Sequence, residues 1–93
     1  MAKSELIKAA IAFLDWEKPW TFASAVLEQL ADDSEGRALF GQLWMEACRF
    51  DNWQQTDISE CCDACDSWLN HRFSWLPEEA RAQFVRAAAY QWK

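Results

Sequence analysis

Glycine and proline are scarce in this chain, with two of each among 93 residues. These residues supply most tight turns, so their scarcity argues against the many turns of a β-sandwich or β-barrel. Apolar residues recur instead at the three-and-four spacing of amphipathic helices. Fourteen aromatic residues supply apolar surface that can offset the entropy cost of ordering the chain. The sequence therefore predicts an all-α, compact bundle of four to five short helices that forms a single domain over residues 1–93.

Five segments carry the helical pattern. The predicted helices span residues 4–15, 21–31, 35–50, 57–72 and 77–93. Ser4 and Thr21 are predicted N-caps of the first two helices. Asp57 and Glu60 have the spacing of an acidic capping box, which would open the fourth helix. Pro77 suits the first turn of the fifth helix, where an N–H group is not needed.

Each predicted helix has one apolar face that we expect to be buried. In the first helix the expected stripe is Leu6, Ile7, Ala10, Ile11 and Leu14. In the fifth it is Phe84, Val85, Ala88 and Trp92. Gly41 lies in the middle of the third helix, where glycine costs about 1 kcal/mol relative to alanine. Close approach of another helix, or a slight kink, would explain Gly41.

Four cysteines give the sharpest chemical pattern: Cys48, Cys61, Cys62 and Cys65. The last three share one face of the predicted fourth helix with Ile58, Leu69 and Arg72, whereas His71 points to nearly the opposite side. A zinc site would therefore need Cys48 and ligands from a second protomer. Nearby acids would also raise the pKa of each thiol and disfavour a redox role. We expect free thiols packed in the core, and neither a metal nor another cofactor.

Catalysis and direct nucleic-acid binding are both disfavoured. The only histidine, His71, is not paired in sequence with a nucleophile or a carboxylate, and the paired carboxylates fall on predicted exposed faces. The helix at 35–50 could be a recognition helix, but it holds two acids against two bases and would be repelled by phosphates. We expect a protein that is not an enzyme and does not contact nucleic acid directly.

Negative charge is concentrated in the middle of the chain. Ten of the fifteen acidic residues lie between Glu28 and Asp66, against two bases, Arg37 and Arg49, so this block carries minus eight while the whole chain carries minus six. Like charges at helical neighbour spacing are unfavourable, and acids at 32 and 33 follow the predicted end of the second helix, where the dipole is negative. Solubility is one explanation, and docking on a basic protein surface is the other.

The candidate partner-binding residues come from this block. They are Glu28, Asp32, Asp33, Glu35, Asp51, Trp53, Glu60, Asp63 and Asp66. Trp53, which is surrounded by polar residues, resembles an exposed interface anchor. The other tryptophans divide into Trp44, Trp68 and Trp92, expected in the core, and Trp16, Trp20 and Trp75 in connectors, where they would plug the ends of the helical stack.

These features lead to one main hypothesis and two alternatives. The chain resembles, in size, charge and helicity alone, the small acidic helical proteins of phages and mobile elements that inhibit restriction or CRISPR nucleases by occupying nucleic-acid channels. The main hypothesis is an inhibitor that docks its acidic face on a basic partner, in the manner of a nucleic-acid mimic. An immunity or antitoxin protein against a basic toxin is one alternative, and a homo-oligomeric structural or adaptor protein is the other. Without a signal peptide or a long apolar run, we expect a cytoplasmic location.

Overall fold

Helices form at the five positions that the apolar periodicity predicts. The computed structural model describes residues 2–92, and they contain α1 (Ala2–Ala12), η1 (Pro19–Thr21), α2 (Phe22–Gln29), α3 (Ser34–Ala47), η2 (Phe50–Trp53), α4 (Ile58–Arg72) and α5 (Glu78–Gln91). The elements η1 and η2 are short 3₁₀ turns in two of the connectors. No strand occurs in this described part, and the predicted all-α fold is confirmed. The predicted end of the last helix at Lys93 lies outside the described residues.

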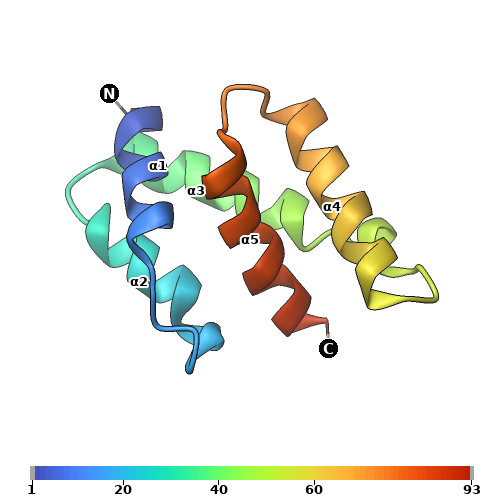
Figure 1. The fold of residues 1–93 in the computed structure, drawn as a ribbon. Coiled ribbons are helices and arrows are strands. Elements are labelled where there is room, and N and C mark those ends of the chain that lie inside the picture. Colours follow the sequence, from blue (N-terminus) through green and yellow to red (C-terminus); the bar gives the residue numbers. More distant parts are fainter. Residues whose placement is uncertain (1, 93) are drawn as a thin grey trace.

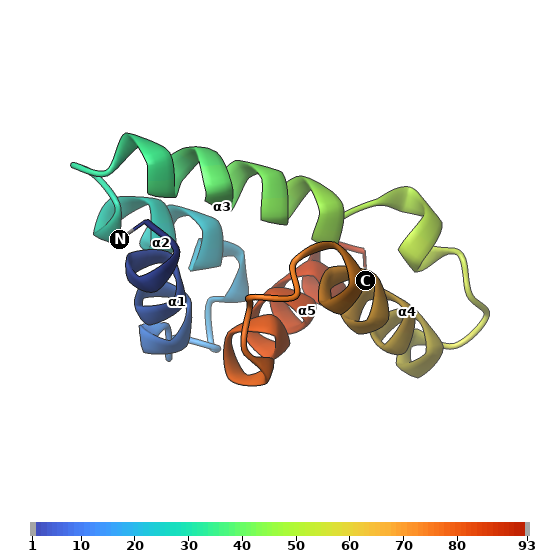
Figure 2. The same ribbon diagram turned by 90° about the horizontal axis from the view of Figure 1, so that it is seen from above.

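The helices are arranged in two layers. Helices α1, α5 and α4 lie side by side in one layer, with α5 in the middle and α4 antiparallel to it (Figure 1). Helix α3 crosses behind all three of them, and α2 lies beside its amino-terminal half (Figure 2). Because α5 is covered by a helix on each side and by α3 behind, its inward face becomes the centre of the core. None of the helices within residues 2–92 has the length and apolarity needed to cross a bilayer.

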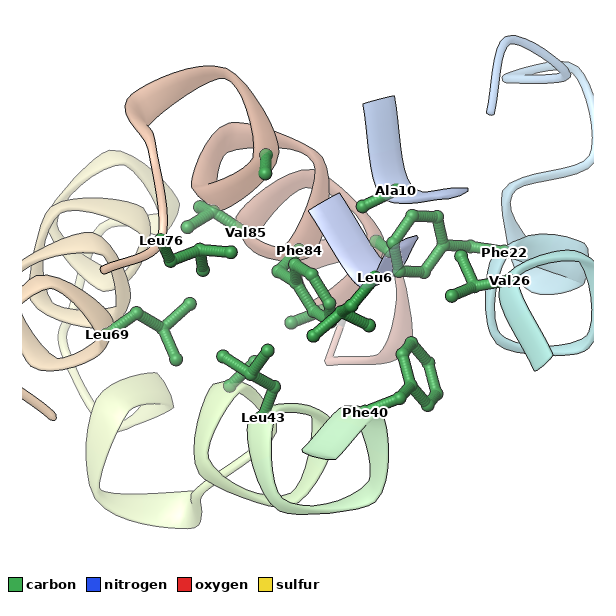
Figure 3. Close-up of a cluster of buried hydrophobic side chains, with 14 of the residues drawn as sticks. Leu6, Ala10, Phe22, Val26, Phe40, Leu43, Leu69, Leu76, Phe84 and Val85 are labelled. Carbon is green, nitrogen blue, oxygen red and sulfur yellow. The ribbon is translucent and has the colours of Figure 1, made fainter. Parts of the chain in front are cut away.

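Aromatic rings fill the centre of the core. Phe84 of α5 lies between the layers and is fully buried (Figure 3). Its ring meets Phe22 of α2 edge-on at 5.3 Å and Phe40 of α3 at 5.6 Å, measured between ring centroids. Edge-to-face pairs at these distances add to the stabilisation from burial alone. Leu6 of α1 and Leu43 of α3 complete this centre, so every long helix except α4 contributes to it.

Aspartate side chains begin two of the helices. Asp57 accepts a hydrogen bond from the backbone N–H of Ser59 at 2.8 Å, and this confirms the predicted cap of α4. Asp33 accepts one from the N–H of Gly36 at 2.9 Å and caps α3. The predicted N-cap at Ser4 is wrong, because Ser4 lies inside α1. Thr21 occupies the N-cap position of α2 as predicted, but its hydroxyl donates to the carbonyl oxygen of Lys18 at 2.6 Å and does not cap the helix.

The end of α1 differs from the prediction. The helix stops at Ala12 instead of Asp15, so the residues that follow leave the helical stripe. Leu14, expected in the core, is 83% exposed, and Phe13 is buried in its place. Phe13 packs edge-on against Phe22, with 5.3 Å between ring centroids. An aromatic partner on α2 therefore decides where the chain turns, and a single-helix pattern does not contain that information.

The carboxyl end of α3 gathers hydrogen-bond donors from three other elements. The indole N–H groups of Trp53 and Trp92 donate to the carbonyls of Ala47 and Cys48, at 2.8 and 3.1 Å. The Trp68 indole donates to the side chain of Glu46 at 2.6 Å. The last carbonyls of a helix have no partner within the helix, so these donors satisfy groups that would otherwise need water. This junction fixes η2, α4 and the end of α5 against α3.

Candidate functional site

The outward side of α4 carries two of the predicted acidic residues in an exposed position. Glu60 and Asp63 are exposed, and the opposite side of the helix buries Cys61, Cys65 and Leu69. No ion pair within residues 2–92 includes either carboxylate. We call Glu60 and Asp63 the α4 acidic surface. Two like charges three residues apart on a helix are mildly repulsive, so this arrangement does not help α4 to fold.

Asp66 does not belong to that unpaired set. Its Oδ1 accepts a hydrogen bond from Nε of Arg81 at 2.6 Å, and the Arg81 side chain, 13% exposed, also donates to Oδ1 of Asn70. The sequence offers Asp66 as a candidate partner-binding acid because no base lies at helical spacing from it, but its partner comes from α5 and not from α4 itself. Asp66 joins α4 to α5, and this structural role explains its presence without a binding partner.

The second group of acids lies at the turn from α2 to α3. Glu28, Asp32 and Glu35 are exposed there, while Asp33 caps α3. The expectation that Asp33 is at an unfavourable helix end is wrong, because a new helix begins one residue later and its amino-terminal N–H groups attract the carboxylate. Arg37 of α3 donates to the carbonyl of Leu27 at 2.9 Å, which supplies a positive charge to the end of α2. The stability of the local helix ends therefore explains Asp33, but it does not explain Glu28, Asp32 and Glu35.

The two acidic groups do not form one surface. The α2–α3 turn lies at one end of the long axis of the molecule, and α4 lies at the other end (Figures 1 and 2). Helices α1 and α5 lie between them in the front layer. A single partner surface of ordinary size would therefore contact one group or the other. The two acidic groups belong to one block of the sequence but lie at opposite ends of the folded molecule (Figure 1).

The two remaining candidates, Asp51 and Trp53, belong to η2. Asp51 is exposed and accepts a hydrogen bond from Nη2 of Arg49 at 2.8 Å, so its charge is partly neutralised. Trp53 is only 9% exposed, because its indole turns inward to the carbonyl of Ala47. The interpretation of Trp53 as an exposed anchor is therefore wrong. Polar neighbours in the sequence did not indicate exposure, since the 3₁₀ turn points neighbouring side chains in different directions.

The cysteines are free thiols that face the interior or its edge. Cys61 and Cys65 are buried, and Cys48 and Cys62 are half-buried. Burial raises the pKa of Cys65 from 9.0 to about 12 and the pKa of Cys48 to about 11. Burial also raises the pKa of Cys62, and nearby Cys61 and Asp63 add to that shift. Within residues 2–92, no three His, Cys, Asp or Glu side chains are grouped as metal ligands would be. The expected packing of the cysteines against the core is confirmed.

A shallow groove separates α4 from α5 next to the α4 acidic surface. This α4–α5 groove has a volume of about 390 Å³. Its lining is Cys62, Asp63, Asp66, Ala82, Val85, Arg86 and Ala89. The floor is formed by small apolar side chains, while Asp63 and Asp66 give one wall a negative charge. The guanidinium of Arg86 lies 4.3 Å from the ring centroid of Trp16, which is outside the lining of the groove.

A second exposed feature escaped the sequence reasoning. Large apolar side chains from four elements form a continuous aromatic band at the carboxyl end of α5. The band consists of Trp20, Phe50, Ile58, Tyr90 and Trp92. Ring centroids of Trp20 and Tyr90 lie 6.0 Å apart, and those of Phe50 and Trp92 lie 5.8 Å apart. Ile58 joins the two pairs, since it lines one cavity with Tyr90 and another with Trp92.

The band corrects two expectations about tryptophan. Trp92 was expected in the core but is 41% exposed, because α5 ends at Gln91 and its last turn projects past the core. Trp20 lies in a connector, as predicted, but at 54% exposure it does not plug the end of the stack. In contrast, Trp16, Trp44, Trp68 and Trp75 are all half-buried. The signal in the sequence is weak, since the outermost band residues, Trp20 and Trp92, are 72 positions apart.

The fold and these surfaces define a small all-α protein with an exposed acidic helix face and an exposed aromatic band. The chain matches no protein-family model, no curated protein sequence and no solved structure.

Proposed function

We propose that this protein is a small protein-binding module that docks its α4 acidic surface on a basic surface of a partner protein. The supporting observation is that Glu60 and Asp63 are exposed, without an ion pair among the described residues, on a helix that gains nothing from their repulsion. Acids that serve neither a cap nor an internal ion pair are the ones that remain for a partner. Opposite charge across an interface steers association and gives it specificity.

The α4–α5 groove supports the same proposal. Stable interfaces combine a desolvated apolar centre with a polar rim. The small apolar side chains of this groove supply such a centre directly beside Asp63, and Glu60 lies one turn earlier on the same helix. A basic segment with one apolar face would contact both features at once. Asp33, Asp51 and Asp66 are left out of the site, because each has a partner within the protein.

The proposed role is not enzymatic. Protonated thiols are weak nucleophiles, and burial raises the pKa of Cys48, Cys62 and Cys65. His71 is exposed near the end of α4, where its ring lies 6.1 Å from the ring of Trp68, between centroids. The proposal places the protein in the cytoplasm, since free cysteines persist in a reducing compartment.

Two kinds of partner fit these electrostatics. A nucleic-acid-binding protein, such as a nuclease, presents a basic channel that the α4 acidic surface would occupy in place of a phosphate backbone. A basic toxin neutralised by an immunity or antitoxin protein would use the same attraction. We favour an inhibitor of a nucleic-acid-binding protein, because a helix bearing regularly spaced acids beside an apolar groove can enter a channel that is built for a nucleic-acid helix.

Charge reversal tests the proposal with a matched control. The test variant is Glu60→Lys with Asp63→Lys, and the control is Glu28→Lys with Asp32→Lys at the opposite end of the molecule. Both change the net charge by the same amount, so non-specific effects of charge are equal. The partner should be captured from host lysate by the wild-type chain and by the control variant, and it should be lost for the test variant alone. The captured complex is then titrated with salt from about 0.05 to 0.5 M, which should weaken an association through opposite charges. If both variants retain the partner equally, or both lose it equally, the α4 acidic surface is not the docking site.

A further inference from the structure

The aromatic band concentrates most of the large apolar surface that the protein exposes. Of the eight large apolar side chains exposed among the described residues, five belong to this band. Scattered exposed apolar residues are normal, but a contiguous group marks an interaction surface. Tryptophan and tyrosine are also the residues that most often carry the binding energy of an interface. Folding explains only part of the band: Trp92 donates to the carbonyl of Cys48, but all five members remain 38 to 63% exposed.

We propose that the aromatic band is the interface of a homodimer, in which it packs against the same band of a second copy. The band adjoins the α4–α5 groove, because Arg86 and Ala89 line both that groove and the cavity beside Tyr90, but the two surfaces differ in chemistry: the band is apolar and aromatic, while the α4 acidic surface is charged. The dimer therefore adds to the proposed docking of a basic partner and does not depend on it.

The exposed area is sufficient for a small dimer. From the exposed fractions of the five side chains and the full area of an aromatic residue, the band presents about 500 Å². Two facing bands would remove about 1,000 Å² from water before any rim residue is counted, which is near the lower bound for a specific interface. An association of this size is expected to be weak and to depend on protein concentration.

The charges beside the band allow a second copy to approach. Among residues 2–92, the charged neighbours of the band, either adjacent in sequence or lining its cavities, are two bases, Arg49 and Arg86, and two acids, Asp51 and Asp57. Their sum is zero, although each copy carries minus six overall. The α4 acidic surface and the α2–α3 turn would repel their own copies, whereas this face would not. Among the exposed surfaces, the band is the one suited to self-association.

The order of side chains along the band also suits a two-fold axis. Ile58 lies in the middle, between a cavity of about 240 Å³ that it shares with Tyr90 and one of about 390 Å³ that it shares with Trp92. A two-fold axis near Ile58 places each end of one band over the opposite end of the other. Trp20 of each copy would then face Trp92 and Phe50 of the other copy, and both cavities would receive an aromatic side chain.

Sedimentation equilibrium between about 10 µM and 1 mM protein tests the dimer. The wild-type chain should show a monomer–dimer equilibrium, and Ile58→Glu should weaken the dimer at least about tenfold by placing two like charges at its centre. Ile58 begins α4, and an acid in the first turn of a helix is favourable, so this variant should fold. Phe50→Ser is a second variant, since Phe50 is 63% exposed. Leu14→Glu is the matched control, because Leu14 is 83% exposed and lines a cavity with Ala25 and Gln29 instead.

Three results would overturn the homodimer. The first is a wild-type chain that remains monomeric at about 1 mM, because even a weak dimer with a Kd of about 1 mM would be substantially populated at that concentration. The second is equal weakening by Leu14→Glu, and the third is a dimer that both Ile58→Glu and Phe50→Ser leave intact. If a monomeric chain instead protects the band on binding another protein, the occupant is that protein and not a second copy. Added salt separates this test from that of the basic partner. Salt screens the repulsion between two acidic copies, so it should not weaken the homodimer, but it also screens the attraction to a basic surface, so it should weaken binding of the basic partner.

Discussion

Replacing Gly41 with alanine should raise the free energy of unfolding by about 1 kcal/mol. Gly41 lies in the interior of α3 and is exposed to solvent. A Cβ added at this position meets no atom within 4 Å, so neither a neighbouring helix nor a side chain opposes the methyl group. The expected close approach of another helix is therefore absent at this position, and nothing in the structure explains the glycine.

The magnitude follows from helix propensity alone. Alanine is better than glycine in a helix interior by about 0.8 to 1.0 kcal/mol, and the new methyl group adds no burial that would change this value. An unfolding entropy near 2.1 cal/mol/K per residue gives about 0.2 kcal/mol/K for 93 residues, so the melting temperature should rise by about 5 °C.

Urea denaturation followed by circular dichroism at the helical band measures this change. The midpoint should rise while the dependence on urea, the m-value, stays constant. Gly36→Ala is the internal control, because a Cβ at Gly36 would lie 2.5 Å from Oδ2 of Asp33 and 3.2 Å from a methyl carbon of Leu30. Displacing the Asp33 cap costs about as much as the helix propensity gains, so this variant should gain nothing. A Gly41→Ala variant that is less stable than wild type would refute the reasoning and point to a kink or a contact at this position.

Four other substitutions or conditions follow from the contacts described above. Asp33→Ala removes the cap of α3 and should lower the free energy of unfolding by about 1 kcal/mol, read from the urea midpoint. Trp53→Phe removes the indole donor and leaves the carbonyl of Ala47 only the weak thiol donor of Cys65 at 3.3 Å, so it should cost about 1 to 3 kcal/mol in the same assay. Arg81→Met breaks the bond to Asp66 and should cost about 1 kcal/mol, and this cost should shrink in 1 M salt. Stability should also fall as pH rises from 9 toward 12, because the raised pKa of Cys65, about 12, keeps its proton bound in the folded state after the unfolded chain has lost it. Cys65→Ala should make this fall shallower in thermal melts at successive pH values.

The fold was predictable because its helices are encoded locally. Spacing of apolar residues placed all five helices, and Asp57 and Pro77 marked the starts of α4 and α5 within a residue. The cysteine face of α4 was also predictable, since residues on one helix keep their relative directions whatever packs against them. Predictions that depended only on neighbours within one helix were therefore reliable in the helix interior, whereas they failed near the helix ends, at Leu14 and Trp92.

The acidic residues show what local patterns leave open. Asp33 and Asp66 looked alike in the sequence, as candidate partner-binding acids of the same negative block. Asp33 caps a helix whose predicted start is one residue too late, and Asp66 pairs with Arg81, which is fifteen positions away on α5. Both roles need either an accurate helix boundary or knowledge of which helices touch. Only Glu60 and Asp63 in α4, and the exposed acids of the α2–α3 turn, keep the unpaired character that the sequence suggested.

Whether a tryptophan is buried depends on a hydrogen-bond acceptor for its indole N–H, and the sequence does not show where that acceptor lies. Trp20 and Trp53 both lie in short 3₁₀ connectors, yet one is 54% exposed and the other 9%. The difference is the carboxyl end of α3, where the carbonyl of Ala47 accepts a hydrogen bond from the Trp53 indole, whereas the Trp20 indole donates to no group among the described residues. Burying an indole without a partner for its N–H is unfavourable, so an indole without such a carbonyl is more stable in water or in contact with another molecule. Exposed aromatic residues such as Trp20 are therefore the positions at which a second chain can supply what the fold does not, and this is the physical basis for placing a dimer interface there.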